Sequence, residues 1–180
     1  MRLFVGVEPS TEAVTVLDRL PRPQARQVRW LRPDQWHVTL RFLGRADPEQ
    51  AREILAGWAA GEGFGGSSEG WKGLSATAVL GPATEVLGDT VVMVPVAGID
   101  ELAASVVAAT AELGEQPDSR TFLGHLTLCR FVMEPPPNSV GRAVVTSFAV
   151  DAVTLFRSRN QPDGVAYEIL DRFPLQGVAS

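Results

Sequence analysis

The stretch that decides the fold is Trp36-His37-Val38-Thr39-Leu40-Arg41-Phe42-Leu43-Gly44, and a second stretch repeats its pattern, Gly124-His125-Leu126-Thr127-Leu128-Cys129-Arg130-Phe131. Both have the form His-x-Thr-x inside a short apolar run that is typical of a β-strand. The chain contains 2 histidines, and each of them begins one copy. Packing alone would not tie a histidine to a threonine two residues later. The repeat therefore predicts two strands that bring two His/Thr pairs to one cleft.

In the first copy, the alternation of side chains between the two faces of a strand fixes the expected orientations. His37 and Thr39 project the same way, and Arg41 joins them. An arginine in that place adds positive charge and a fork of donors that matches phosphate geometry. The opposite face, which we expect to be core, carries Val38, Leu40 and Phe42.

In the second copy, the same alternation places His125, Thr127 and Cys129 on one face. Nothing in the sequence identifies a partner that would activate Cys129, so we interpret it as a passive small residue. Alternation puts Arg130 on the face opposite His125, unless a β-bulge or the strand end re-aims it. The core face of this strand carries Leu126 and Leu128.

Two facing imidazoles supply a general base and a general acid together, because their unperturbed pKa of about 6.5 allows either role near neutral pH. Threonine hydroxyls beside them are neutral donors suited to phosphate oxygens. The combination indicates in-line phosphoryl chemistry without a metal. Two alternatives stay open: a lone histidine in an apolar strand is usually a satisfied, partly buried residue, and a histidine-ligated metal site would need a carboxylate cluster that the sequence does not show.

Length and composition narrow the function further. A chain of 180 residues fits one domain with a sizeable core, or two small lobes that share one. The net charge of −5 argues against broad binding along a nucleic-acid backbone, although not against a small site that grips one phosphate. The single cysteine rules out an internal disulfide and suits a reducing compartment. With no signal peptide and no apolar run long enough for a bilayer, we expect a cytoplasmic protein without membrane association.

The expected elements alternate between strands and helices. Helices are predicted over residues 11–20, 47–58 (with Asp47 as the N-cap) and 100–113. Each of the two motifs lies in a predicted strand. Residues 148–157 and 165–173 read as a β-hairpin. The two motifs lie about half the chain length apart. We therefore predict one α+β domain over residues 1–180, bilobal, with two antiparallel β-sheets each flanked by helices and related by a pseudo-twofold duplication around a central cleft. A monomer is expected.

The chain resembles the 2H phosphoesterase superfamily, named for its two His-x-Thr/Ser-x motifs, and within it the LigT-like RNA 2′,3′-cyclic phosphodiesterases, historically called 2′-5′ RNA ligases. The resemblance runs nearly end to end. Besides the two motifs it rests on Arg2-Leu3-Phe4-Val5, Val28-Arg29-Trp30, Val153-Thr154-Leu155-Phe156-Arg157-Ser158-Arg159 and Arg172-Phe173-Pro174-Leu175.

The resemblance implies that the chain opens a terminal 2′,3′-cyclic phosphate on RNA, or on the corresponding nucleotides, to a 2′-phosphomonoester. It also implies reversible 2′-5′ ligation of RNA such as tRNA halves, with no metal and no cofactor. By the same resemblance His125 is the base that activates water, and His37 is the acid that protonates the leaving oxygen. Thr39 and Thr127 then hold the non-bridging phosphate oxygens.

Two departures from the family pattern concern basic and backbone positions. Arg41 stands where the family commonly has lysine, and Gly124 stands where it often has proline before the second histidine. Arg130 resembles the family's basic residue after the second motif, so both arginines are candidates for contact with phosphate. Other activities of the superfamily stay open, namely opening of ADP-ribose 1″,2″-cyclic phosphate and RNA 3′-end trimming. A non-catalytic RNA-end binding module is the alternative outside enzymology.

Overall fold

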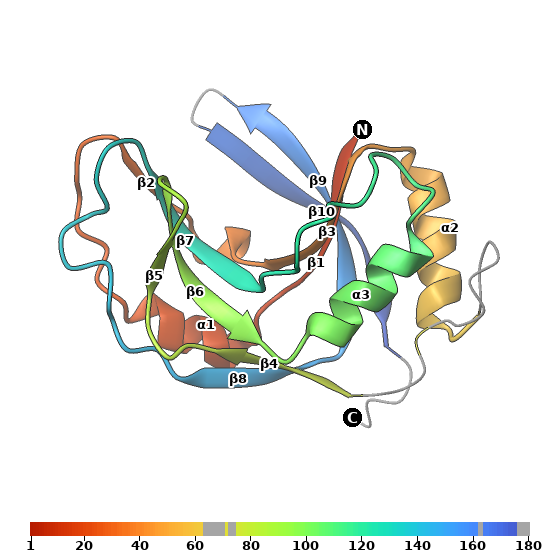
Figure 1. The fold of residues 1–180 in the computed structure, drawn as a ribbon, viewed down its shortest axis with the longest axis horizontal. Coiled ribbons are helices and arrows are strands. Elements are labelled where there is room, and N and C mark those ends of the chain that lie inside the picture. The colour runs from red at the N-terminus through yellow and green to blue at the C-terminus, as the bar shows by residue number, and fades with distance from the viewer. Residues whose placement is uncertain (63–70, 72–74, 162–163, 176–180) are drawn as a thin grey trace.

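The structure, a computed structural model, describes residues 1–62, 71, 75–161 and 164–175 (Figure 1). Its helices are α1 (Thr11–Asp18), α2 (Pro48–Ala59) and α3 (Asp100–Ala109), with a 3-10 turn, η1, over Pro33–Gln35. Its strands are β1 (Arg2–Val7), β2 (Val28–Trp30), β3 (Val38–Arg45), β4 (Ala76–Leu80), β5 (Glu85–Leu87), β6 (Val91–Ala97), β7 (His125–Phe131), β8 (Thr146–Val150), β9 (Ala152–Gln161) and β10 (Gly164–Pro174). The predicted α+β class is confirmed.

The strands form one curled antiparallel sheet in the order β10-β9-β1-β3-β7-β6-β4-β8, with β2 added beside β7 and β5 beside β6. The two motif strands, β3 and β7, meet in the middle of this order. They pair through Val38 and Leu126 alone, whereas the neighbouring ladders pair along several residues. The two predicted half-sheets are therefore present, but this narrow seam joins them edge to edge into a single sheet.

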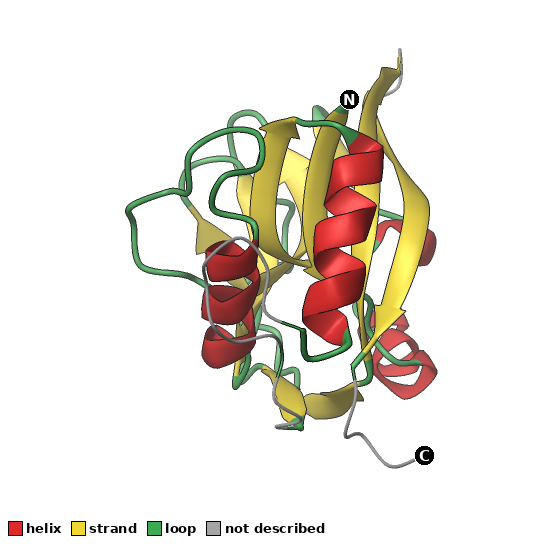
Figure 2. Ribbon diagram, turned by 90° about the vertical axis from the view of Figure 1, so that its right-hand side faces the viewer, coloured by secondary structure: helices red, strands yellow, loops and turns green. Residues whose placement is uncertain are grey.

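The helices cover the sheet unequally (Figures 1 and 2). Helix α2 packs on β10, α3 packs on β3, and the two helices touch each other, so both lie on the β10-to-β3 half. Helix α1 packs on β8 of the other half. The Asp47 side chain caps α2 as predicted, because it accepts hydrogen bonds from the backbone N–H groups of Glu49 and Gln50.

Helix α3 is shorter than its sequence pattern predicts. Its N-cap is Ile99, and it ends at Ala109 instead of reaching Leu113. The hydroxyl of Thr110 donates to the Val106 carbonyl at 2.7 Å and closes the last helical turn. The backbone N–H of Leu113 then bonds to the Thr110 carbonyl in a further turn, which leads the chain back toward β3.

The C-terminal region differs from expectation in one respect. Residues 148–157, predicted as a single strand, are divided at Asp151 into the end of β8 and the start of β9. Strand β8 pairs with β4, whereas β9 pairs with β1 and β10 in the other half-sheet. The break therefore lets consecutive strands join opposite ends of the sheet order. The predicted hairpin of β9 and β10 is confirmed, and its turn residues 162–163 lie outside the described residues. No helix among the described residues is long and apolar enough to cross a membrane.

Candidate active site

The seam between β3 and β7 brings the two motifs together. Because the strands are antiparallel and Val38 lies opposite Leu126, the residue before one partner lies alongside the residue after the other. His37 therefore lies alongside Thr127, and Thr39 alongside His125. Val38 and Leu126 are fully buried and point away from these four residues. The face of the sheet that carries His37, Thr39, His125 and Thr127 is called the histidine face below.

The two histidines are anchored in the same way. The Nδ1 atom of His37 lies 2.8 Å from the backbone oxygen of Gln35, and Nδ1 of His125 lies 2.8 Å from that of Leu123. A carbonyl oxygen only accepts hydrogen bonds, so each Nδ1 carries a hydrogen. In the neutral ring, Nε2 is then the unprotonated nitrogen that is available to a substrate.

The strand β3 does not alternate regularly beyond Thr39. In its ladder with β1, Gly6 lies opposite Thr39 and Val5 lies opposite Arg41, so Leu40 is an extra residue in a β-bulge. The bulge turns Arg41 to the core face, where it is only 5% exposed, and turns Phe42 to the histidine face, where it is 64% exposed. The predictions that Arg41 shares a face with His37 and that Phe42 is core are therefore wrong.

Arg41 instead ties β3 to the segment that follows α3. Its guanidinium donates to the backbone oxygen of Phe42 at 2.5 Å and to that of Glu115 at 2.5 Å. Burial lowers its pKa, as removal of a charged group from water must. Because two of its donors bond to backbone carbonyls, Arg41 stabilises the fold at this point. We therefore do not include Arg41 in the phosphate site.

Strand β7 contains the matching bulge. In its ladder with β6, Met93 lies opposite Thr127 and Val92 lies opposite Cys129, so Leu128 is the extra residue. This shift turns Cys129 into the core and re-aims the exposed Arg130 to the histidine face. Within the described part of the chain, the side chain of Arg130 makes no hydrogen bond or ion pair, and it is close enough to His37 to influence the pKa of His37.

The threonines have free donors. Within residues 1–62, 71, 75–161 and 164–175, neither Thr39 nor Thr127 hydrogen-bonds to protein through its hydroxyl, and both side chains are partly exposed on the histidine face. Each hydroxyl is therefore available to an oxygen of a bound anion. The structure thus places both predicted threonines and Arg130 beside the two histidines.

An aromatic cluster packs around His37. The Phe4 ring lies 4.8 Å from the His37 ring, and Phe156 stacks on Phe4 at 4.8 Å with an interplanar angle of 8°. The Tyr167 ring meets His37 edge-on, with centroids 4.7 Å apart and an angle of 78°. These side chains come from β1, β9 and β10, so the C-terminal hairpin helps to enclose the first histidine.

This enclosure changes the acid–base behaviour of His37. Burial lowers the pKa of His37 from 6.5 to about 4, and the nearby charges of His125 and Arg130 act in the same direction. The hydrogen bond to the Gln35 oxygen and the Glu8 carboxylate oppose the shift. His37 is therefore neutral at pH 7 in the ligand-free protein, with its proton on Nδ1.

The remaining titratable groups near the site have other partners. Glu8 accepts hydrogen bonds from Arg172 and from the Thr154 hydroxyl, and the Arg172 contact holds the pKa of Glu8 below its usual range. Burial raises the pKa of the Cys129 thiol to about 11, so it stays protonated. Among the described residues, no group of three or more histidine, cysteine or acidic side chains comes together to hold a metal.

Sequence reasoning missed three residues at this site. Phe4 lies in a run whose neighbours Leu3 and Val5 are also buried, so alternation gave no signal for its orientation. Glu8 is a charged residue directly after a strand, a common surface position. Gln35 sits in the turn that leads into the first motif, and the only available signal was its place two residues before His37.

Comparison with known proteins agrees with this geometry. A family described as LigT-like phosphoesterase matches residues 5–63, which include the first motif. The RNA 2′,3′-cyclic phosphodiesterase of Geobacillus stearothermophilus is 27% identical over 186 residues, an alignment that covers 97% of this chain and 57% of that protein. The chain thus spans little more than half the length of that relative.

Solved structures share the whole fold. The crystal structure of TT0787 of Thermus thermophilus matches with a TM-score of 0.77 and 27% identity, covering 99% of this chain and 100% of the other. The structure of E. coli LigT complexed with 3′-AMP matches with a TM-score of 0.71 and 24% identity, covering 97% and 98% of the two chains, and bears on the fold. Taken with the paired His-x-Thr segments, these matches show that the chain is similar to the LigT-like phosphoesterases, whose family model matches residues 5–63 and whose fold it shares over nearly its whole length.

Proposed function

We propose that this chain is a metal-independent phosphodiesterase that hydrolyses terminal 2′,3′-cyclic phosphates of RNA, or of the corresponding nucleotides, to 2′-phosphomonoesters. The observation that carries the proposal is the pair of His-x-Thr segments on one face of the β3–β7 seam, with the Nε2 atom of each histidine free of its anchoring hydrogen bond. The relative from Geobacillus stearothermophilus, named for the same reaction, supports the choice of substrate.

In the proposed reaction, a water molecule attacks phosphorus in line with the bond to the 3′ oxygen. Nε2 of His125 accepts the proton of the water as its oxygen bonds to phosphorus. The bond between phosphorus and the 3′ oxygen breaks, and that oxygen takes a proton from Nε2 of His37. The hydroxyls of Thr39 and Thr127 and the guanidinium of Arg130 stabilise the charge on the non-bridging oxygens.

His37 must be protonated on Nε2 to act as this acid, although its pKa of about 4 leaves it neutral in the free protein at pH 7. A phosphodiester anion bound beside the ring favours the imidazolium and so raises this pKa. The account therefore requires that substrate binding and protonation of His37 be coupled. Uptake of a proton on binding a phosphate anion, measured by calorimetry in buffers of different ionisation enthalpy, is the expected sign of that coupling.

The finer features of the activity follow from the same proposal. Attack by the 5′-hydroxyl of a second RNA in place of water makes the reaction a 2′-5′ ligation, for which tRNA halves are suitable ends. We further propose that residues 1–180 act as a single monomeric domain, because both motifs of the seam come from one chain.

The test is a panel of matched substrates: an RNA with a 2′,3′-cyclic end, ADP-ribose 1″,2″-cyclic phosphate and an RNA with a free 3′ hydroxyl. We expect turnover of the first, at least about 10³-fold reduced in His37→Asn and in His125→Asn, and unchanged in the control Arg52→Gln on the distant helix α2. Preferential turnover of another substrate would move the chain to a different activity of the superfamily. Tight RNA binding without turnover, retained in both histidine variants, would favour a binding module.

A further inference from the structure

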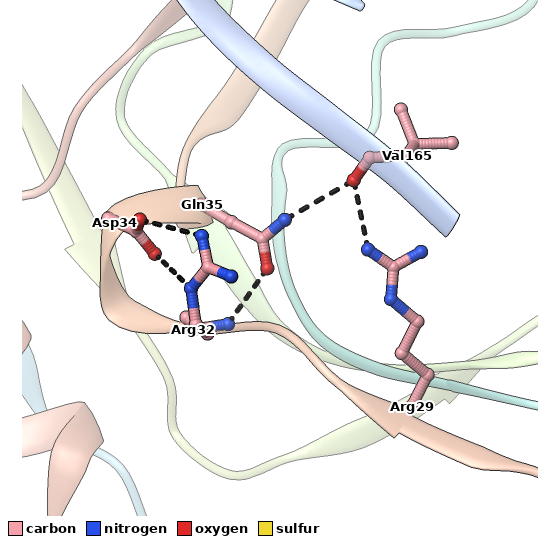
Figure 3. Close-up of polar contacts among 5 residues, drawn as sticks. All are labelled: Arg29, Arg32, Asp34, Gln35 and Val165. Carbon is pink, nitrogen blue, oxygen red and sulfur yellow. Dashed lines mark hydrogen bonds and ion pairs between the residues drawn. The ribbon is translucent and has the colours of Figure 1, made fainter. Parts of the chain in front are cut away.

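One backbone carbonyl at the start of β10 accepts hydrogen bonds from two side chains that lie far away in the sequence (Figure 3). The oxygen of Val165 accepts a hydrogen bond from Nη2 of Arg29 at 2.9 Å and from Nε2 of Gln35 at 3.2 Å. Val165 belongs to β10, Arg29 to β2 and Gln35 to η1. Val165 follows Arg29 by 136 residues and Gln35 by 130 residues, so this junction is a tertiary contact.

The junction spans the seam between the half-sheets. Strand β2 pairs with β7 on one side of the seam, whereas β10 belongs to the half-sheet that contains β3. Since β3 and β7 pair through a single pair of residues, the ladder alone leaves their relative placement weakly fixed. The hydrogen bond from Arg29 to Val165 provides a second link across the same boundary, and the bond from Gln35 ties η1, just before β3, to the same carbonyl.

Both polar atoms of the Gln35 side chain and its backbone carbonyl are hydrogen-bonded. Its side chain is 7% exposed, and its Oε1 accepts the backbone N–H of Arg32 at 3.1 Å while its Nε2 donates to Val165. Its own carbonyl oxygen is the one that accepts from Nδ1 of His37 at 2.8 Å. A buried amide whose oxygen and nitrogen are both bonded has one favoured orientation, and so the carbonyl that orients His37 is fixed in space.

The second histidine lacks such a support. Its anchoring carbonyl belongs to Leu123, which is 55% exposed and occupies the position equivalent to Gln35 in the other motif. The difference indicates that the Gln35 amide is not required for the strand entry as such, because the second copy enters its strand without one. It serves the histidine that is enclosed by the hairpin.

Gly164 makes room for the junction. A Cβ atom at this position, where φ is +121°, would overlap Nη1 of Arg29. The guanidinium therefore lies directly against the glycine backbone while it donates to the next carbonyl. The hairpin and Arg29 fit one another at this point, which is expected if their contact is a defined part of the fold.

We propose that Gln35 is a positioning residue for His37, and that Arg29 and the β9–β10 hairpin act on His37 through it. The hydrogen bond between the Gln35 side-chain amide and Val165 fixes the position of the Gln35 backbone carbonyl. This carbonyl in turn fixes the Nδ1–H tautomer of His37 and the direction in which Nε2 of His37 points. The kinetic consequence rests on the proposed phosphodiesterase function. The effect on the tautomer of His37 does not, and the two are tested separately.

The test compares Gln35→Met, which keeps the side-chain length but removes both hydrogen bonds of the amide, with the neighbouring control Arg32→Gln. Among the described residues, the Arg32 side chain bonds only to the exposed Asp34. Nitrogen-15 NMR of the ring atoms is simple because the chain has 2 histidines. We expect the His37 signals of Gln35→Met to shift from a single tautomer toward a mixture, with those of His125 unchanged. We expect kcat to fall about 10- to 100-fold while KM stays within about threefold.

Variants of Arg29 provide a second test in the same NMR comparison. Arg29→Met should shift the His37 signals in the same direction by a smaller amount, and Arg29→Lys, which keeps a donor for Val165, should restore them. Wild-type ring signals of His37 in a folded Gln35→Met protein would overturn the proposal, whatever the kinetics. If the wild type turns over no cyclic phosphate, the proposed function fails, and the NMR comparison still decides the role of Gln35.

Discussion

The enclosed position of His37 makes the stability of the protein depend on pH in a defined way. The folded protein holds this imidazole with a pKa of about 4, whereas the unfolded chain exposes it with the ordinary value of 6.5. Between these two values the unfolded state binds a proton that the folded state does not. The free energy of unfolding must therefore rise with pH across this window and decrease as the solution is acidified.

The magnitude follows from the size of the shift. A pKa lowered from 6.5 to about 4 corresponds to about 3 kcal/mol, at about 1.4 kcal/mol for each unit. This stability is present in full above pH 6.5 and is lost as the pH falls toward 4. His37→Asn keeps a polar side chain of similar reach but does not titrate, so this part of the pH dependence disappears in the variant.

Urea unfolding followed by tryptophan fluorescence, at several pH values from neutral down to the folded-state pKa of His37, measures the effect. Carboxylates such as Glu8 also cost stability in acid, but the Arg172 contact, which both proteins keep, is the largest cause of the lowered Glu8 pKa, so this contribution is nearly the same in both. The difference between wild type and His37→Asn therefore isolates the imidazole. His125→Asn, which retains His37 and its burial, should keep most of the wild-type slope, because burial is the largest cause of the lowered His37 pKa. Parallel stability–pH curves for wild type and His37→Asn would refute the inference that His37 is enclosed and neutral in the folded protein.

Three further substitutions test other parts of the site. Arg130→Gln should raise KM for a cyclic phosphate about tenfold with little change in stability, because its exposed guanidinium faces the anion; an unchanged KM would remove it from the phosphate site. Arg41→Met should lower stability by about 2 to 4 kcal/mol, as seen in chemical denaturation, since two interior carbonyls lose their donors, and a variant as stable as wild type would contradict that environment. Gly124→Ala should destabilise by about 1 to 3 kcal/mol in the same assay, because a Cβ there would clash with the Val96 oxygen; no loss would show that the backbone adjusts freely.

Local sequence patterns predicted the parts of this protein that depend on local physics. The two motif strands, the Asp47 cap of α2 and the C-terminal hairpin follow from side-chain alternation, capping chemistry and turn residues, and the structure contains each of them. The placement of both histidines and both threonines on one face also followed, because each His-x-Thr unit lies before its bulge.

The features that escaped prediction depend on partner strands. The bulges at Leu40 and Leu128 exist only relative to the ladders with β1 and β6, and nothing within either motif strand marks them. Their effect is large, since the first exchanges the faces of Arg41 and Phe42. The second turns Arg130 toward the histidines, an orientation that the sequence allowed only if a bulge was present. The division of residues 148–157 is of the same kind, because alternation does not reveal which strand will be the neighbour.

The contrast between the two halves is informative about function. The position equivalent to Arg130 in the first motif strand is Phe42, and both are exposed on the histidine face. A twofold arrangement of the motif strands thus carries a cation on one side and an aromatic ring on the other. We expect an anion bound at the seam to be held asymmetrically, closer to the β7 side.

The most direct test of the central claim is phosphorus NMR of a short RNA with a 2′,3′-cyclic end, incubated with the protein in the presence of a chelator. The account predicts clean conversion to the 2′-phosphomonoester, lost in both His37→Asn and His125→Asn. A 3′-phosphate product would contradict the assigned leaving group, and full activity in either variant would contradict two-histidine acid–base catalysis.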